Sequence, residues 1–256
     1  MKPVKVKGTV IGEGIPKICV SIIGKTESDI IKEADCIKEL NADIIEWRVD
    51  FFENAADINS VIDALKKIRI IFNDKPIIFT WRSAKEGGQK EISSPYYVKL
   101  NETVAKSKLA DIIDIELFTK EEDTKGIVRI AHENNIFVII SNHDFDKTPP
   151  REQIIWRMQK EQELGADILK IAVMSHSAAD VLALMSAASI MKEKYSEHPL
   201  IAIAMGTKGV ISRISGEIFG SDISFGAAKN SSAPGQIYVA DLRNALKLIH
   251  NNLNEE

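Results

Sequence analysis

The stretch DILKIAVM, residues 167–174, is the strand around which the predicted fold is built. It is nearly all apolar, it is rich in β-branched residues, and it lies between Gly165 and a polar segment at residues 175–177, as buried strands do. Alternation along a strand places Ile168, Lys170 and Ala172 on one face, while the other face is apolar throughout. The stretch therefore predicts a buried strand with a single amine in its middle.

Lys170 is the one residue that such a strand does not ordinarily contain. A lysine rarely enters a protein interior without a partner or a chemical role. A site without water favours the neutral amine, which is a nucleophile toward carbonyl carbons. A lysine that extends from the strand end, or that is held in a structural salt bridge, explains the pattern equally well. The strand alone leaves both interpretations open.

Composition and charge exclude several classes of function. The chain has 256 residues and a formal net charge of −4 at pH 7, with Lys and Arg spread along it, which argues against nucleic-acid binding. No apolar run approaches the roughly 18 residues of a membrane span, and the N-terminus lacks the apolar stretch of a signal peptide. Cys19 and Cys36 form no CxxC pair or Cys/His cluster, so we expect buried, inert thiols and no metal site. These features predict a cytoplasmic protein that binds neither nucleic acid nor membrane.

Strands and helices are predicted to alternate along the chain. After a hairpin at residues 4–14 with Gly8 at its turn, the apolar patterns predict eight strand-then-helix units. Such alternation implies right-handed crossovers and a parallel sheet, and eight units in about 250 residues fit a (β/α)8 barrel. The predicted strands are residues 17–23, 43–48, 76–82, 111–117, 136–142, 167–174, 199–205 and 222–227, and the helices are residues 26–40 (with Thr26 as a possible cap), 58–72, 95–107, 119–134, 150–164, 178–195, 210–219 and 239–252.

A doubly wound open sheet is the structural alternative to a barrel. No strand is followed by the GxGxxG turn of a dinucleotide-binding fold, because Gly12 and Gly14 precede a strand and lack the third glycine. No linker or low-complexity segment divides the chain. We therefore predict an α/β fold, a single (β/α)8 TIM-barrel domain over residues 1–256, with the N-terminal hairpin closing the bottom of the barrel.

Polar residues gather where the predicted strands end, which in a barrel is the edge that carries the chemistry. Three arginines in one mouth suit a small anionic substrate, because guanidinium binds carboxylate with two hydrogen bonds. Structural ion pairs such as Glu46–Arg48 are an alternative for the charges, but they do not explain a lysine or a histidine. The residues in the predicted strands or just after them are Ser21, Glu46, Arg48, Arg82, Glu86, Asp114, Glu116, His143, Lys170, Met205 and Arg213, with Ser232 and Gln236 in a polar loop at residues 229–236.

Lys170 and His143 lie in neighbouring units and form the candidate catalytic pair. An imine between Lys170 and a substrate ketone would acidify the neighbouring C–H bond. His143 would move protons, since the ordinary pKa of histidine lies near working pH, and Glu86 is the candidate to orient it. A loop histidine bonded to backbone is the alternative for His143. The other four histidines lie on helices or beside strands, where surface or capping roles suffice.

Six blocks of sequence, in order along the chain, carry a resemblance to a known family. They are EWRVD (46–50), FTWRSAKEGG (79–88), SNHDF (141–145), GADILKIA (165–172), GVISR (209–213) and SAPGQ (232–236). With them the sequence resembles the type I 3-dehydroquinate dehydratase family along nearly its whole length. The resemblance implies a (β/α)8 barrel, a homodimer, and no metal or organic cofactor. It also implies the dehydration of 3-dehydroquinate to 3-dehydroshikimate in the shikimate pathway, toward chorismate and the aromatic amino acids.

The resemblance also implies a role for each matched residue. Lys170 forms the Schiff base, His143 removes the proton beside the imine and protonates the departing hydroxyl, and Glu86 supports His143. Arg213 binds the substrate carboxylate. The departure from the family pattern is Gly206, where a serine is expected after Met205, so no hydroxyl contact is expected there. The remaining substrate contacts are Glu46, Arg48, Arg82 and Met205, with Ser21 at the rim and Ser232 and Gln236 on a loop that closes over the substrate.

Two other functions fit a barrel lysine. A class I aldolase or transaldolase also uses an imine, but it acts on sugar phosphates and needs a phosphate cradle after the seventh and eighth strands. Arg213 and the loop at residues 232–236 favour a carboxylate instead. A non-catalytic barrel kept for binding is the third hypothesis, and it predicts an ordinary, protonated Lys170.

Overall fold

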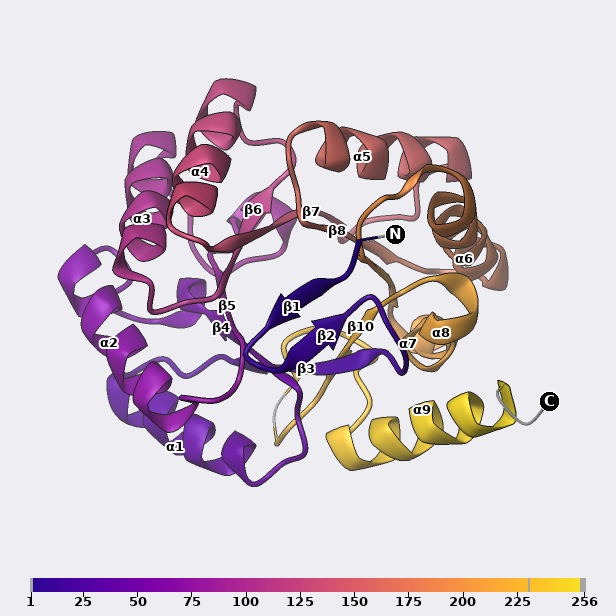
Figure 1. The fold of residues 1–256 in the computed structure, drawn as a ribbon, viewed down its shortest axis with the longest axis horizontal. Helices are drawn as coiled ribbons and strands as arrows, with labels where there is room; N and C mark the ends of the chain where they lie inside the picture. The colour runs from indigo at the N-terminus through magenta and orange to yellow at the C-terminus, as the bar shows by residue number, and fades with distance from the viewer. Residues whose placement is uncertain (1, 230, 254–256) are drawn as a thin grey trace.

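Eight parallel strands form a barrel at the centre of the molecule, and helices surround it (Figure 1). The computed structural model describes residues 2–229 and 231–253. Neighbouring strands pair in the order β10-β3-β4-β5-β6-β7-β8-β9, so the predicted TIM barrel is confirmed. The strands are β3 (Lys17–Ile22), β4 (Ile44–Arg48), β5 (Ile77–Thr80), β6 (Ile112–Glu116), β7 (Phe137–Asp144), β8 (Ile168–Met174), β9 (Leu200–Met205) and β10 (Ile223–Gly226).

Side chains help to close the barrel between its last two strands. The backbone N–H of Asp222 donates to the carbonyl of Leu200 at 2.7 Å, and the carboxylate of Asp222 accepts the N–H of Leu200 at 2.9 Å. Two residues further along β9, the N–H of Ala202 donates to the hydroxyl of Ser221 at 3.0 Å. Between β9 and β10, side-chain hydrogen bonds therefore replace part of the regular backbone ladder.

Helices cover the outside of the barrel, one after each strand except β9, which two short helices follow. Thr26 caps the first of them as predicted, since its side chain accepts the N–H of Asp29 and the Asp29 carboxylate accepts the N–H of Thr26. In the described part of the chain, no helix combines the length and the hydropathy needed to cross a bilayer. The helices are α1 (Glu27–Lys38), α2 (Ile58–Ile71), α3 (Ser94–Ser107), α4 (Glu121–Glu133), α5 (Arg151–Glu163), α6 (Ala178–Ile190), α7 (Val210–Ile214), α8 (Gly216–Phe219) and α9 (Val239–Leu253), with 3-10 turns at Val49–Phe51, Ala84–Glu86 and Thr207–Gly209.

Two predicted helices are not continuous. The helix predicted over residues 178–195 is α6 up to Ile190 and then a π-helix over Met191–Tyr195. The helix predicted over residues 210–219 divides into α7 and α8 at Ser215, whose hydroxyl donates to the carbonyl of Ile211 at 2.7 Å. The next residue, Gly216, packs so closely that a Cβ there would lie 2.4 Å from the carbonyl oxygen of Ser221. Contact with the segment before β10 therefore breaks the helix.

The two cysteines lie in different environments. Cys19 is buried inside the barrel, as predicted. Cys36 is exposed, and the prediction that it is buried is wrong. It lies on α1 beside the stripe formed by Ile30, Ala34 and Ile37, which are the residues that this helix buries.

The N-terminal hairpin closes the bottom of the barrel, as predicted. It consists of β1 (Val4–Val6) and β2 (Thr9–Ile11), and it lies across the centre of the view in Figure 1. Lys7 and Gly8 form its turn with φ angles of 45° and 76°. Ile11 and the two valines pack with Ile44, Ile112 and Ile168, the first residues of three barrel strands. The N-terminal end of the barrel is thereby filled with apolar side chains, which leaves the other end for polar ones.

Candidate active site

Lys170 lies in the barrel interior on β8 and is 3% exposed. Its Nζ is 2.8 Å from Oδ2 of Asp114 and 3.5 Å from Oε1 of Glu46. The ring centroid of Phe225 is 4.7 Å from the same nitrogen. Two carboxylates at these distances stabilise an ammonium strongly where water is excluded. Without substrate, Lys170 is therefore held in a buried ion-pair network.

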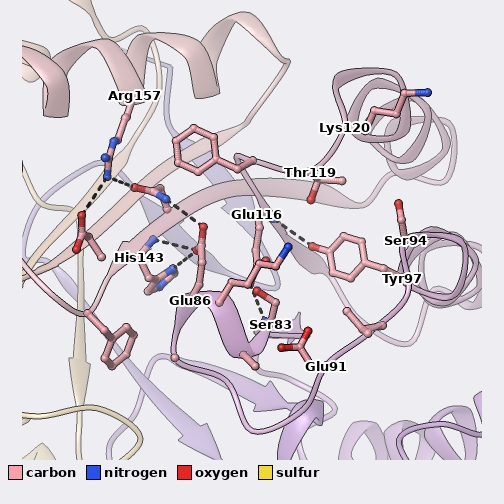
Figure 2. A pocket seen from close by; sticks show the side chains of 18 of the residues that line it. Ser83, Glu86, Glu91, Ser94, Tyr97, Glu116, Thr119, Lys120, His143 and Arg157 are labelled. Atoms are coloured by element: carbon pink, nitrogen blue, oxygen red, sulfur yellow. Dashed lines mark hydrogen bonds and ion pairs between the residues drawn. The ribbon is translucent and has the colours of Figure 1, made fainter.

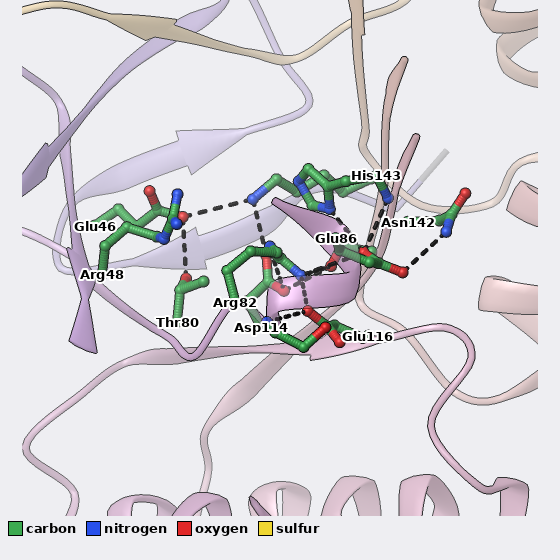
Figure 3. A network of polar contacts seen from close by, with 12 residues as sticks. Glu46, Arg48, Thr80, Arg82, Glu86, Asp114, Glu116, Asn142 and His143 are labelled. Carbon is green, nitrogen blue, oxygen red and sulfur yellow. Dashed lines mark hydrogen bonds and ion pairs between the residues drawn. The ribbon is translucent and has the colours of Figure 1, made fainter. Parts of the chain in front are cut away.

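His143 and Glu86 form a hydrogen-bonded pair in the same mouth. The parallel ladder sets Ser141 against Lys170 and His143 against Ala172, so His143 shares a face with the lysine, one step nearer the strand end. Nδ1 of His143 is 3.0 Å from Oε2 of Glu86, and this oxygen also accepts the backbone N–H of His143 at 2.9 Å. Figure 3 shows Glu86 between His143 and Asn142. When Glu86 is ionised, Nδ1 donates its proton to this oxygen and Nε2 keeps its lone pair.

Burial sets the protonation state of this pair. Removal from water, together with the cations of Arg82 and Lys170, lowers the pKa of His143 well below its ordinary value. Burial raises the pKa of Glu86 to about 8, although the cation of Arg82 opposes the shift. At neutral pH the imidazole is therefore uncharged, which is the form that can accept a proton.

Arg82 and Arg48 are already paired. Arg82 lies 2.8 Å from Asp114, 3.1 Å from Glu116 and 3.6 Å from Glu86, which makes it the cationic centre of a carboxylate cluster (Figure 3). Arg48 donates to both oxygens of Asp50, at 2.8 and 2.9 Å. The alternative in which Glu46 pairs with Arg48 is wrong. Glu46 instead accepts from Ser21 at 2.6 Å and from Thr80 at 3.0 Å.

Arg213 differs from the other arginines of the mouth. It is 2% exposed, and its two terminal nitrogens donate to the carbonyls of Phe225 at 3.3 Å and Pro234 at 2.9 Å. Among the described residues no carboxylate pairs with it, and its Nε has no partner. Burial lowers the pKa of this guanidinium to about 10. A buried cation without a counter-ion marks a place for an anion.

A cavity of about 40 Å³ surrounds the Lys170 amine. Residues 231–236, called the lid loop below, lie over it, and Asn230 of the predicted polar loop lies outside the described residues. Ser21 does not line the cavity; it bonds to Ser232 at 3.0 Å and to Glu46 at its edge. The other ten predicted site residues all line it: Glu46, Arg48, Arg82, Glu86, His143, Lys170, Met205, Arg213, Ser232 and Gln236.

A second, open cavity of about 870 Å³ lies on the far side of the His143–Glu86 pair (Figure 2). His143, Glu86 and Phe145 line both cavities, so they form the wall between them. Arg157 is drawn at the edge of the second cavity, joined to Glu86 through an amide. The pair is therefore reached from two sides.

Asp114 is a site residue whose role the sequence did not show. Although burial opposes it, the cations of Arg82 and Lys170 hold the pKa of Asp114 far below its ordinary value. Its carboxylate also accepts the hydroxyl of Ser141 at 2.6 Å. The available signal was the spacing of Asp114 and Glu116, two apart on a buried strand, which places both in the mouth. Asp50 carried no such signal, because it follows its strand in a 3-10 turn.

Comparisons with known proteins give one consistent result. The family model described as Type I 3-dehydroquinase matches residues 18–253. A 3-dehydroquinate dehydratase of Bacillus licheniformis is 53% identical over 252 residues, covering 98% of this chain and 99% of that protein. One from Clostridium novyi is 48% identical over 251 residues, with 98% and 99% covered. The solved type I 3-dehydroquinate dehydratase of Clostridium difficile, with covalent modified comenic acid, has a TM-score of 0.96 and 50% identity, covering 98% of this chain and 99% of that one.

Proposed function

The chain belongs to the type I 3-dehydroquinase family, and from that premise we propose that it dehydrates 3-dehydroquinate to 3-dehydroshikimate through an imine on Lys170. The observation that carries the proposal is that two different basic side chains line one cavity. Lys170 is an amine beside a histidine–carboxylate pair, and Arg213 is a buried guanidinium without a counter-ion. A ketone that also bears a carboxylate fits both.

The carboxylate of the substrate would pair with Arg213. Two parallel hydrogen bonds to a carboxylate would replace the carbonyl contacts that the guanidinium now makes to Phe225 and Pro234. Because Pro234 belongs to the lid loop, binding of the anion and movement of this loop would be coupled. The cavity is only about 40 Å³, which is too small for a cyclic acid. Movement of the lid loop on binding would make room for it.

The imine would form after Lys170 releases one proton. The neutral imidazole of His143 lines the same cavity and is the candidate acceptor. The amine then adds to the ketone carbon, His143 returns its proton to the carbonyl oxygen, this oxygen leaves as water, and a C=N⁺ bond replaces C=O, so His143 is neutral again. Asp114 and Glu46 would stabilise the positive charge that persists on this nitrogen.

Elimination would follow from the imine. His143 would take the proton from the carbon beside C=N⁺, the C–H electrons would form an enamine, and the enamine would expel the hydroxyl on the next carbon. That hydroxyl would leave as water with the proton that His143 returns. Addition of water to the remaining iminium would release the product and the free amine. Glu86 would keep the Nδ1 proton in place, so that Nε2 is the atom that exchanges protons.

Borohydride reduction with 3-dehydroquinate present, followed by intact mass and peptide mapping, tests the proposal. We expect a stable adduct on Lys170, its absence in Lys170→Ala, and its persistence in the control Lys66→Ala, whose lysine is exposed. His143→Ala should still form the adduct but turn over slower by about 10²-fold or more. Equal loss of adduct in both active-site variants would refute this division of roles. Cleavage of a phosphorylated ketose, with 3-dehydroquinate left unchanged, would favour the aldolase instead.

Membership of this family also supports three proposals about the role, location and oligomeric state of the protein. We propose that the enzyme serves the shikimate pathway, that it acts in the cytoplasm, and that two copies form a homodimer. Sedimentation at several concentrations would report twice the mass of the chain for a dimer, and a mass equal to one chain at all concentrations would refute it.

A further inference from the structure

Helix α5 packs on the outside of β7 and β8, yet it turns two ionisable side chains toward the barrel. Arg157 and Glu161 are one helical turn apart and are 8% and 0% exposed, while Arg151 and Glu163 on the same helix are exposed. Burying such groups on the outer face of a sheet is costly unless they hold something in place. None of the steps proposed above uses them.

Arg157 is connected to His143 through two hydrogen-bonded side chains. Its Nη1 donates to Oδ1 of Asn142 at 2.6 Å, and Nδ2 of Asn142 donates to Oε1 of Glu86 at 3.0 Å. The other oxygen of Glu86 accepts the Nδ1 proton of His143 at 3.0 Å. Figure 2 shows Arg157 at the outer end of this chain and His143 at its inner end. The arginine fixes which way the Asn142 amide faces, and the amide fixes one oxygen of Glu86.

Glu161 contacts the other member of the catalytic pair. Its Oε2 accepts the backbone N–H of Lys170 at 2.9 Å, and its Oε1 has no partner among the described residues. The preceding residues of this strand follow the ladder, since the N–H groups of Asp167 and Leu169 donate to the carbonyls of Val138 and Pro199. At Lys170, which stays in register with Ser141 and Ile201, a side chain from α5 therefore also binds the backbone of the strand.

We propose that Arg157 and Glu161 are positioning residues of the reaction, one aligning His143 and the other fixing the backbone of Lys170. Because both side chains come from one helix, α5 sets the distance between the base and the nucleophile. The inference rests on the proposed function. It goes beyond that function by assigning a role to a helix that contributes no side chain to the cavity around Lys170.

Other charged groups also face the His143–Glu86 pair, so the effect of Arg157 has to be isolated. These are Arg48 at the end of β4, Arg82 after β5, Asp114 and Glu116 on β6, and Lys170 on β8. All of them stay unchanged in a variant of Arg157. Asp144 at the end of β7 lies 3.8 Å from Arg157 and loses this ion pair in the variant, so the double-mutant cycle with Asn142 described below separates its effect from that of the Asn142–Glu86 connection.

Arg157→Met tests the first half of the proposal. Loss of the cation and of the Asn142 anchor favours protonation of both Glu86 and His143. We expect the acid limb of kcat to move up by about half a pH unit, with kcat lower by about 10-fold or more. Imine trapping at high pH should be retained. Arg151→Met, on the exposed face of α5, should change neither. A lower melting temperature with an unmoved acid limb would show that Arg157 only anchors the helix.

A double-mutant cycle guards against general unfolding of the Arg157 variant. If the effect passes through Asn142, adding Arg157→Met to Asn142→Leu should cause almost no further loss of kcat, because the connection is already broken. Full additivity of the two losses would overturn the proposed chain of contacts.

Glu161→Gln and Glu161→Leu test the second half. Burial raises the pKa of Glu161 well above its ordinary value, so a glutamine resembles the protonated acid and keeps an acceptor for the Lys170 N–H. We expect Glu161→Leu to slow imine trapping by about 10-fold or more, with the pH profile unchanged, and Glu161→Gln to stay near wild type. Glu163→Leu is the exposed control. Equal trapping rates in the Leu and Gln variants would refute the positioning role.

The same assays separate this inference from the proposed function. Wild-type protein that forms no adduct with 3-dehydroquinate contradicts the function itself. A normal adduct in wild type, with unaltered rates and pH limits in both Arg157→Met and Glu161→Leu, contradicts the inference alone.

Discussion

Asp114 shows how much of the site depends on one carboxylate. It lies fully buried between Lys170 and Arg82, at 2.8 Å from each. Breaking a buried ion pair by removing one partner leaves an uncompensated charge and costs far more than the pair contributes. The charge balance of the mouth is therefore itself a stability requirement.

Asp114→Asn should destabilise the fold and disturb the chemistry together. We expect the free energy of unfolding in urea to fall by about 3 kcal/mol. Imine formation should also slow, because the amine loses the carboxylate that orients it. Asp63→Asn, which breaks an exposed pair with Lys66, is the control and should leave both measurements unchanged. An Asp114 variant with wild-type stability would show that Glu46 alone compensates the lysine.

The raised pKa of Glu86 predicts the direction in which the free energy of unfolding changes with pH. Its pKa in the folded state is raised from 4.5 to about 8, so the folded protein binds this proton more tightly than the unfolded chain does. Protonated Glu86 therefore contributes its full stabilisation when the pH is below its pKa in the unfolded chain. This contribution is lost as the pH rises through its pKa in the folded protein. The difference in unfolding free energy between wild type and Glu86→Gln should therefore decrease by about 1 kcal/mol per pH unit between about pH 5 and pH 8. Urea unfolding at a series of pH values measures it. A difference that grows with pH would mean that the carboxylate stays ionised.

At the residue scale, the sequence indicated which side chains share the mouth but not which of them pair. Barrel topology brings strand ends together, so Glu46, Arg48 and Lys170 were correctly placed in one cavity. Pairing depends on distances around the ring and on turns between elements. Arg48 therefore pairs with Asp50, two residues on, and Glu46 lies near Lys170, four strands away in the sheet order.

At the scale of elements, strands and most helices were predicted to within a few residues, and the exceptions are the division into α7 and α8 and the π-helix that follows α6. Each strand is a short apolar run bounded by polar or turn residues, and this local pattern is sufficient. The break at Ser215 lies where Gly216 packs against Ser221, and the π-helix after Ile190 lies where Gly220 packs against Lys192. A local sequence pattern does not show contacts between segments that are distant in the chain.

The lid loop is the element whose movement the proposed reaction requires. Gly235 has φ +78°, and a Cβ there would lie 2.5 Å from the carbonyl oxygen of Gly206. We expect Gly235→Ala to hold the lid loop away from the mouth and to raise KM by about 10-fold. Steady-state kinetics measure the change. Gly14→Ala is the matched control, since Gly14 has φ +65° with no atom within 4 Å of a Cβ, so it carries backbone strain alone.

The comparison between these two glycine variants shows whether a change in KM comes from backbone strain or from the contact with Gly206. Backbone strain alone lowers the melting temperature in both and leaves KM unchanged in both. A rise in KM that is confined to Gly235→Ala identifies the contact between the lid loop and Gly206 as the closed position of the loop.

At the scale of the whole molecule, the polar candidate site lies at one end of the barrel and the apolar hairpin at the other. The bottom is closed by the hairpin and lined by apolar residues, and the top holds the amine, the imidazole and the arginines. In a (β/α)8 barrel, changes at the N-terminal end of the strands are expected to affect folding and not turnover. The hairpin lets this separation be measured on a single chain.

Ile11→Ala is the variant that measures it. Ile11 is fully buried among the first residues of the barrel strands, so truncation should leave a cavity and lower the free energy of unfolding by about 3 kcal/mol. Its neighbour Val10 is half-buried on the other face of the hairpin, and Val10→Ala should cost clearly less. If the chain is a single domain, as proposed, urea unfolding should remain one transition, and kcat/KM of the folded fraction should equal that of wild type. A loss of kcat/KM in folded Ile11→Ala would show that packing at the bottom of the barrel reaches Lys170 along β8, and the two ends would then not be independent.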